Sequence, residues 1–380
     1  MSFVYLNHAA TSFPKPPEVL DAVAAALASP PADPGRGGLD SDTVEICRRR
    51  IAELFGLRRP EAVSIQPSAT HALNAAILGL LEDGGHAVTT PLEHTSVLRP
   101  LHHLAAHHEV ACDFVEPRAD GRLEPLDIAR AVIPSTRLVV VCHAANSTGV
   151  VQPVEEIADA VAGAGVALLV DASQTAGVVG LRMNDLAGRV LVAVAGHKSL
   201  LGPAGTGALL LADDDLPQTV FGGTGVRSES LDHPAELPLR HEAGTPNLPA
   251  IAGLSAGLEV VRARGIDEEA AKRNRLVHRL RQRLAAIPEV WLAPLARDDG
   301  RAGVVAFNVA NWRSEDLAFA LHSAFSIVTR GGLHCAPLAH RFLGLFPEGT
   351  LRASFGWSST EDDADALADA VARIVRGGHP

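Results

Sequence analysis

The chain has 380 residues, of which 47% are hydrophobic and 20% charged, and its mean hydropathy is +0.14. This composition predicts a globular protein, long enough for two domains, and excludes intrinsic disorder. The net charge of −11 argues against nucleic acid as a partner, and no apolar run is long enough to span a membrane. Four cysteines without a C-x-x-C pair predict neither a disulfide framework nor a zinc site. Because no secretory signal pattern is visible, we expect a cytoplasmic protein.

The N-terminal segments predict a short arm followed by two helices. Residues 5–12 form the arm, and several prolines separate it from a helix expected over residues 18–28. A second predicted helix reaches residue 55 and carries Cys47 beside Arg48. Arginines can lower the pKa of a thiol, but a solvated helix face with an unreactive cysteine is the simpler interpretation.

Strand-like and helical segments then alternate, which predicts a mostly parallel sheet with helices on both faces. Residues 63–65 form the first predicted strand of this series. Ser68 and Thr70 follow it, at the start of an alanine-rich helix that runs to residue 81. A phosphate could bind the free N–H groups of this helix start, or Ser68 could be an ordinary helix cap. Locally, the two interpretations carry equal weight.

Polar residues also follow three other predicted strands. His94 follows the strand at 87–90, Asn146 follows the strand at 137–142, and Asp171 follows the strand at 166–170. Open α/β sheets bind their ligands at this carboxyl edge. A buried carboxylate such as Asp171 needs strong donors. These would be either the N–H groups of its own turn or the protonated ring nitrogen of a pyridoxal cofactor.

Lys198 lies in a loop of Gly, Pro, Ser and Thr between two apolar runs, residues 190–195 and 207–211. A lysine at the end of a buried strand loses solvation, which lowers its pKa and allows a Schiff base with an aldehyde such as pyridoxal phosphate. From this stretch alone, a solvated lysine is the simpler interpretation. The neighbouring strand ends change that balance. The residues expected to share one crevice are Thr70, His94, Asn146, Asp171, Gln174, His197 and Lys198.

The C-terminal segments predict a smaller α+β domain. We expect helices from residue 248, over 268–284 and over 362–375, with strands near 304–309. We therefore expect a large domain at residues 15–250, and a small domain made of residues 1–14 and 251–380. Arg273 begins a run of arginines that is most simply a solvated helix face. His103 and His107 have the spacing of a metal-binding pair but lack a third ligand, so no metal site is predicted.

Taken in order, these segments resemble the class V, fold-type I pyridoxal-phosphate enzymes, and among them the cysteine desulfurases of the SUF type. The resemblance runs nearly from end to end. The matching segments are residues 5–12, 67–70, 92–94, 143–149, 170–174, 196–198, 242–247, 330–338 and 350–355. It implies an α/β fold of the fold-type I transferases, with a mostly parallel, seven-stranded sheet in the large domain.

The resemblance also implies how these residues bind pyridoxal 5'-phosphate. Lys198 would bind the cofactor covalently and move the Cα proton of the substrate, Asp171 would keep the ring nitrogen protonated, and His94 would lie over the ring. Asn146 and Gln174 would form hydrogen bonds near the ring hydroxyl. The phosphate would be held by Ala69, Thr70 and His197, together with Thr224 from the neighbouring subunit of a homodimer.

Arg352 would take the substrate carboxylate as a bidentate pair, with Arg330 and Asn146 completing the substrate site. Cys335 would attack the substrate sulfur, become a persulfide and release alanine. Its neighbour His334 and the preceding glycines fit a mobile loop end that carries a reactive thiol.

The chain departs from the family pattern at three positions. Asn7 stands where the family often has Asp, which we expect to matter little. Ala69 and Ala195 each lack a hydroxyl that could bind the phosphate, so we expect weaker cofactor binding, although backbone N–H groups can still hold the phosphate.

The predicted function is a homodimeric, pyridoxal-phosphate-dependent cysteine desulfurase that converts L-cysteine to L-alanine. The closest alternative is a C–S lyase with the same site, which eliminates cysteine or a related thioether or sulfoxide to pyruvate. Selenocysteine lyases and amino-acid epimerases are further relatives. A sulfur carrier or binding partner with little turnover is a third hypothesis, which the intact Lys198, Asp171 and Arg352 disfavour. The resemblance leaves open which acceptor, such as a partner protein, receives the sulfur.

Overall fold

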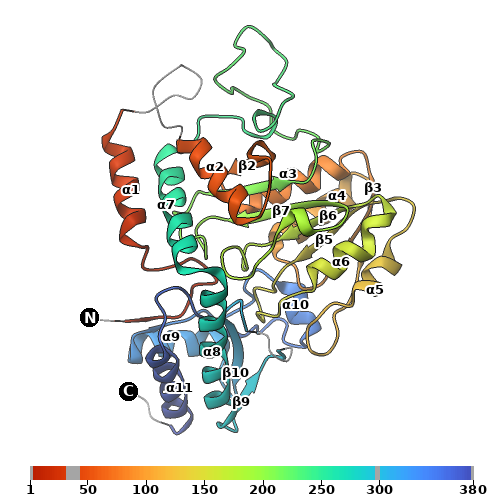
Figure 1. Cartoon of the computed structure of the whole chain (residues 1–380). Coiled ribbons are helices and arrows are strands. Elements are labelled where there is room, and N and C mark those ends of the chain that lie inside the picture. The colour runs from red at the N-terminus through yellow and green to blue at the C-terminus, as the bar shows by residue number, and fades with distance from the viewer. Residues whose placement is uncertain (1–2, 31–42, 296–299, 378–380) are drawn as a thin grey trace.

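Figure 1 shows the computed structural model of the chain, which describes residues 3–30, 43–295 and 300–377. A seven-stranded sheet with its helices forms the upper part in this view, and a smaller group of helices and strands lies below it. Within these described ranges, no helix is both long and apolar enough to cross a membrane.

The large sheet has the strand order β2-β8-β7-β6-β5-β3-β4. Its strands are β2 Val63–Gln66, β3 Gly85–Thr89, β4 Val110–Phe114, β5 Thr136–Cys142, β6 Ala167–Asp171, β7 Arg189–Ala195 and β8 Gly207–Leu211. β8 runs antiparallel to both of its neighbours, and the other pairs are parallel. The predicted mostly parallel α/β sheet is therefore confirmed.

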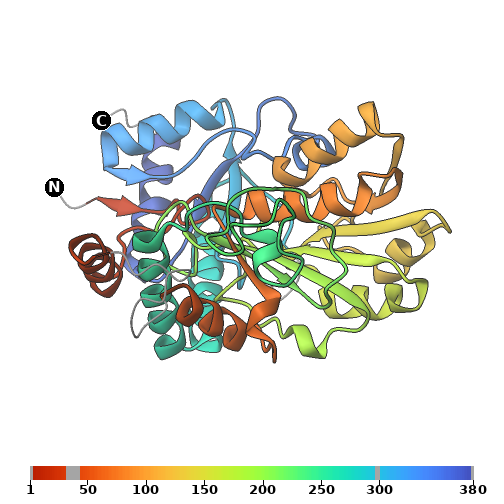
Figure 2. The ribbon, with the colours of Figure 1, turned by 90° about the horizontal axis from the view of Figure 1, so that it is seen from above.

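Helices cover both faces of this sheet because its central strands are apolar on both sides. Along β5, Val139 and Val141 enter one core, while Leu138 and Val140 enter the other. Viewed from above, α3 and α4 lie on one side of the sheet and α5 and α6 on the other (Figure 2). The helices of this part are α1 Pro17–Ala28, α2 Thr43–Leu54, α3 Ala69–Leu81, α4 Thr95–His107, α5 Pro125–Ala131, α6 Val154–Val161 and α7 Leu248–Arg264.

The smaller part combines the N-terminal arm with the last third of the chain. Its elements are β1 Val4–Tyr5, α8 Ile266–Ala285, β9 Val290–Leu292, β10 Val304–Val309, α9 Ser314–Phe325, β11 Ile327–Val328, α10 Pro337–Phe342, β12 Leu351–Ser354 and α11 Glu361–Val375. β12, β10 and β9 form an antiparallel sheet, and β1 pairs in parallel with β11. Leu6, Phe307 and Val371 share its core. The exact domain limits stay a prediction, and residues 1–2, 31–42, 296–299 and 378–380 of those ranges lie outside the described residues.

Two basic helix faces that were predicted to be solvated are partly buried. Cys47 is fully buried in the core under α2, and Arg48 is 4% exposed. Arg273 on α8 is 3% exposed. Arg48 forms an ion pair with Glu242, which is distant in sequence. Arg273 forms one with Glu269, one helical turn earlier on α8. Ion pairing makes burial of these charges tolerable, and the residue types alone do not reveal such a pairing.

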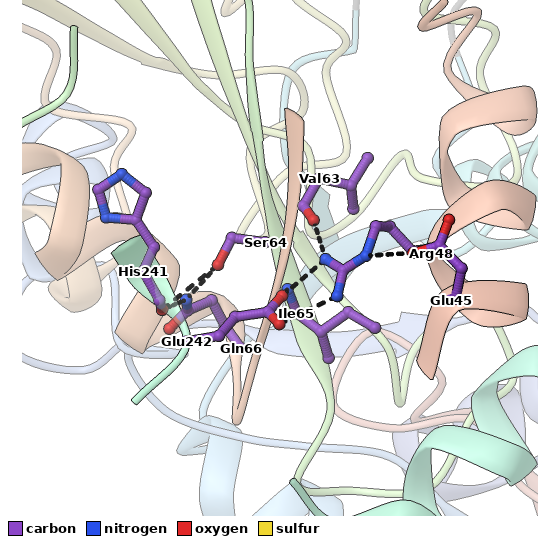
Figure 3. Close-up of polar contacts among 8 residues, drawn as sticks. All are labelled: Glu45, Arg48, Val63, Ser64, Ile65, Gln66, His241 and Glu242. Atoms are coloured by element: carbon purple, nitrogen blue, oxygen red, sulfur yellow. Dashed lines mark hydrogen bonds and ion pairs between the residues drawn. The ribbon is translucent and has the colours of Figure 1, made fainter. Parts of the chain in front are cut away.

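A long connection, residues 212–247, leaves the sheet and extends beyond it, drawn in green at the top of Figure 1. Phe221 and Leu231 are exposed on it. Its C-terminal end is anchored to the sheet edge (Figure 3). There Arg48 pairs with both oxygens of Glu242 at 2.7 and 3.0 Å, and the Ile65 N–H donates to the same carboxylate at 2.6 Å. Short 3-10 helices complete the chain at Pro60–Ala62, Ala162–Ala164, Met183–Asp185 and Leu239–His241.

Candidate active site

A cavity of about 210 Å³ lies at the carboxyl ends of β3, β5, β6 and β7, with residues of the smaller part on its wall. The predicted residues that line it are Ala69, Thr70, His94, Asn146, Asp171, Gln174, His197, Lys198, Arg330 and Arg352. Ala195 also lines it. Cys335 and Thr224 are not part of this lining.

Lys198 lies in the loop after β7, and its amine is in a buried environment. Burial lowers the pKa of the Lys198 amine to about 8, and the nearby Asp171 opposes this shift. A larger fraction of the amine is therefore neutral than in a solvated lysine at the same pH. This environment favours a nucleophilic lysine over the solvated one that the local sequence indicated.

Asp171 ends β6 and is 6% exposed. Its Oδ1 accepts a hydrogen bond from the Ser173 N–H at 2.9 Å. The carboxyl group thus binds its own turn, as one interpretation predicted, and lines the cavity, as the other requires. The two interpretations are compatible because a carboxyl group has two oxygens.

His94 is the N-cap of α4, and its Nδ1 accepts from the Ser96 N–H at 3.0 Å. In the neutral ring, the proton is therefore on Nε2. Burial lowers the pKa of His94 to about 4, which keeps the ring neutral near pH 7. The Ser96 hydroxyl lies 2.8 Å from both His94 Nδ1 and Thr70 Oγ1. Ser96 was missed by sequence reasoning, although its place two residues after a histidine cap was a usable signal.

The start of α3 provides an anion-binding end of the cavity. Its first turn contains no acidic residue, and Ser68 caps it by accepting from the His71 N–H at 3.3 Å. A Cβ on Gly207 would lie 2.6 Å from the Ser68 carbonyl carbon and 2.8 Å from the Ala69 nitrogen. Only glycine lets β8 pack this closely against the turn, and a helix start with unpaired backbone N–H groups suits an anion such as a phosphate.

The N-terminal arm also contributes to the site. The sequence alone did not indicate this role of the arm. Ala9 and Ala10 line the cavity, and the Gln174 side chain donates to the Ala9 carbonyl at 3.1 Å. His197 Nδ1 lies 3.1 Å from Thr11 Oγ1. The hydroxyls of residues 11 and 12 were the available signal, but they did not indicate which distant residue they meet.

Two arginines, Arg330 and Arg352, also line the cavity. Arg352 is 1% exposed and donates to the Asn146 carbonyl at 3.0 Å and to Asn7 Oδ1 at 3.4 Å. Burial and the neighbouring Arg330 lower the pKa of Arg352 to about 9. Two adjacent cations in a buried wall attract a carboxylate strongly, which suits an amino-acid substrate.

Cys335 lies beside these arginines on a tightly held turn. Arg330 Nη2 is 4.0 Å from its Sγ, and the side chain is exposed. His334 and Cys335 both have positive φ angles, 51° and 58°, a region that non-glycine residues rarely occupy. The His334 carbonyl accepts from Asn146 Nδ2 at 2.7 Å, and the Cys335 carbonyl accepts from the Thr95 N–H at 2.8 Å. Hydrogen bonds therefore tie the turn to the cavity wall, and the mobility expected from its glycines stays a prediction.

Thr224 lies outside the cavity of its own chain. Its hydroxyl donates to the Val226 carbonyl at 3.4 Å, within the long connection. Any contact of Thr224 with a cofactor would have to involve a second copy of the chain.

The residues present fit pyridoxal phosphate. Asn146 Oδ1 is buried and has no hydrogen-bond partner among the described residues, so it can accept from a ligand hydroxyl. The start of α3 suits a phosphate, Asp171 a protonated ring nitrogen, and Lys198 an aldehyde. Among the residues that the structure describes, no group of three or more acidic, histidine or cysteine side chains could hold a metal ion.

A family model described as aminotransferase class V matches residues 4–367. The chain belongs to the class-V aminotransferase family. Enzymes of this family depend on pyridoxal phosphate, in agreement with the chemistry of the cavity.

Curated relatives match the chain over nearly its whole length. A probable cysteine desulfurase from Pyrococcus abyssi is 31% identical over 98% of this chain and 94% of that protein. One from Synechocystis is 30% identical over 98% of this chain and 91% of that protein. The solved apo structure of a cysteine desulfurase from Thermococcus onnurineus NA1 is 30% identical, with a TM-score of 0.87, and covers 99% of this chain and 95% of that one. The predicted resemblance to the cysteine desulfurases is confirmed.

Proposed function

We propose that this chain is a pyridoxal-phosphate-dependent cysteine desulfurase, which converts L-cysteine to L-alanine and carries the sulfur on Cys335. One observation carries the proposal: an exposed thiol stands on a tied turn, 4.0 Å from Arg330, which lines the same cavity as Lys198. An enzyme that only eliminates the substrate sulfur has no need for a thiol in this place.

Each residue of the cavity has a task in this reaction. The cofactor would be held through its aldehyde by Lys198, through its ring nitrogen by Asp171 and through its phosphate by the start of α3. When bound, it stabilises negative charge at the substrate Cα. Lys198, with its lowered pKa, can take the Cα proton once its amine is free. Arg352 and Arg330 would bind the substrate carboxylate and orient its sulfur toward Cys335.

The sulfur step is a displacement at sulfur. The Cys335 thiolate forms an S–S bond with the substrate sulfur while the bond between that sulfur and Cβ breaks. The electron pair of the broken bond stays with the carbon, which takes up one proton to become alanine, and this balances the proton that Cys335 lost. The resulting persulfide passes its outer sulfur to an acceptor or to a thiol reductant.

We also propose a homodimer in which Thr224 of one subunit contacts the phosphate of the other. The location of Thr224 outside its own cavity and the exposed Phe221 and Leu231 on the same connection support this arrangement. A sulfur-acceptor protein and a cytoplasmic location stay predictions.

Product analysis with L-cysteine and dithiothreitol tests the proposal, with Cys335→Ala compared with wild type. We expect alanine and sulfide in equal amounts from wild type, and a loss of more than about 100-fold in Cys335→Ala without loss of the cofactor absorbance. Cys112→Ala is the matched control. It removes a half-buried cysteine on β4 that does not line the cavity, so this variant should retain activity. Pyruvate and ammonia that persist in Cys335→Ala would instead assign the protein to the eliminating C–S lyases. Release of alanine and selenide from selenocysteine alone would indicate a selenocysteine lyase.

A further inference from the structure

Residues from two distant segments of the chain contact both neighbours of Lys198, at the carbonyl of His197 and at the side chain of Ser199. On one side, the carbonyl of His197 accepts hydrogen bonds from the Ser12 N–H at 3.0 Å, Thr11 Oγ1 at 3.1 Å and Lys15 Nζ at 2.9 Å. A carbonyl oxygen has two lone pairs, so this number of donors around one oxygen is unusual. It fixes the peptide group that joins His197 to Lys198.

Lys15 is the charged member of this group. It is half-buried between two prolines, and its amine also donates to Ser12 Oγ at 2.7 Å. The prolines restrict the backbone around it, so the lysine has few conformations to lose when its amine binds the His197 carbonyl. A hydrogen bond from a cation is stronger than one between neutral groups.

On the other side of Lys198, Arg273 donates from Nη1 to Ser199 Oγ at 2.9 Å. Its guanidinium is oriented by Glu269, whose Oε1 lies 3.0 Å from Arg273 Nε and whose Oε2 lies 3.0 Å from Arg264 Nη2. A Cβ on Gly303 would lie 3.0 Å from Arg273 Cδ, so the glycine leaves the space that the arginine stem occupies. The buried guanidinium therefore has a defined position at the junction of α8 and the Lys198 loop.

We propose that Lys15 and Arg273 are positioning residues for Lys198, which hold its Cα in place from two sides. This inference rests on the proposed function, in which the lysine amine leaves the cofactor when substrate binds and then acts on the substrate Cα. Only the side chain has to move in that exchange if the backbone stays fixed, and the amine then returns to the same position in each turnover. Lys15 lies between the N-terminal arm and α1, and Arg273 lies on α8. Both parts must therefore be packed against the Lys198 loop before Lys198 is in place.

Two substitutions remove the contacts without removing a group that touches cofactor or substrate. Lys15→Met removes the cationic donor to the His197 carbonyl. Its matched control is Lys272→Met, since Lys272 is also half-buried and also donates to a backbone carbonyl, that of Trp357 at 2.7 Å. Ser199→Ala removes the acceptor of Arg273 and leaves its ion pair with Glu269 intact. Its matched control is Ser255→Ala, where Arg50 donates to a buried serine hydroxyl at 2.6 Å.

The first readout is the rate at which apoprotein captures pyridoxal phosphate, followed by the visible absorbance of the cofactor bound at Lys198. The second is the split between kcat and KM with L-cysteine. We expect Lys15→Met and Ser199→Ala to slow capture and kcat by about 10-fold each, with KM within about twofold of wild type, because a displaced reacting group costs rate more than binding. The two controls should stay within about twofold of wild type in both readouts.

Wild-type capture rates in both test variants would overturn the inference, even if the protein is a desulfurase. Equal losses in the test variants and their controls would overturn it as well, because they would reflect general destabilisation. If wild type captures the cofactor but makes no alanine, the proposed function fails, while the capture rates still decide whether Lys15 and Arg273 position Lys198.

Discussion

Burial and charge act in opposite directions on Lys198 at the residue scale. The low-polarity surroundings lower the pKa of its amine to about 8, and the carboxyl group of Asp171 limits that decrease. Burial also lowers the pKa of His94, to about 4, although Asp171 acts in the opposite direction there as well, so the ring stays neutral near pH 7. The cavity thus combines a readily deprotonated amine with a neutral imidazole, which is a suitable combination for moving a proton near pH 7.

The pKa of Lys198 predicts how apoprotein captures pyridoxal phosphate as a function of pH. The neutral amine attacks the aldehyde, so the capture rate should rise with pH and level off above about pH 8. An ordinary lysine would level off near about pH 10.4. In Asp171→Asn, the midpoint should shift to lower pH because a charge that favours the ammonium form is lost. Absorbance measured after rapid mixing tests both statements, and a wild-type midpoint near pH 10 would contradict the burial argument.

The Arg48–Glu242 pair joins three elements at the scale of secondary structure. Arg48 comes from α2, the Ile65 N–H from β2, and Glu242 from the end of the long connection (Figure 3). Gln66 adds a hydrogen bond to the His241 carbonyl at 2.8 Å. These contacts fix the end of the connection where it returns to the sheet edge, although the connection itself has little secondary structure.

Removal of one charge from this pair should destabilise the protein strongly. Glu242→Gln leaves the buried Arg48 with only the more exposed Glu45 as an ion-pair partner, and we expect a loss of about 3 kcal/mol in the free energy of unfolding. Glu259→Gln is the control, because Glu259 is 35% exposed in its pairs with Arg50 and Arg262, and it should cost less than about 1 kcal/mol. Urea unfolding followed by circular dichroism measures both. Equal effects of the two substitutions would show that burial does not govern the strength of the Arg48 pair.

At the scale of the whole molecule, buried neutral histidines make stability depend on pH. Burial lowers the pKa of His8 to about 3, and lowers the pKa of His143 and of His197 to about 4 each. In the unfolded chain, each would have a pKa near about 6.5. Since the folded pKa is the lower one, each histidine contributes stability above pH 6.5, and this contribution is lost as pH falls toward 4.

We therefore expect acid destabilisation that begins before the carboxylates titrate. Between pH 6.5 and 5, each such histidine should lower the free energy of unfolding by up to about 1.4 kcal/mol per pH unit. Urea unfolding at pH 7.5, 6.0 and 5.0 measures the slope. His143→Gln removes one of these titrating groups, so it should reduce the slope by the contribution of one histidine. His143 is suited to this test because it is buried in the fold. A slope unchanged by this substitution would mean that His143 is not kept neutral by burial.

Local patterns in the sequence predicted the α/β class, the sheet-forming segments other than β4, and the residues at several of their carboxyl ends. Asp171 and Lys198 could be predicted because Asp171 ends one apolar strand and Lys198 lies three residues beyond another, and the direction of a strand determines where the next residues lie. Helix limits were also close: the helix predicted over 268–284 spans Ile266–Ala285. Cys335 and Arg352 depended on the family resemblance, since no periodicity distinguishes them.

The tertiary structure alone decided which distant groups meet. The burial of Arg48 depends on Glu242, which is distant in sequence, and the hydrogen bond from Lys15 to the His197 carbonyl joins residues more than 180 positions apart. The turn at Cys335 is likewise held by Asn146 and Thr95, which belong to other strand ends. Side-chain periodicity reports only whether a position faces a core. The identity of the partner across that core is a property of the packed chain, so it appears only in three dimensions.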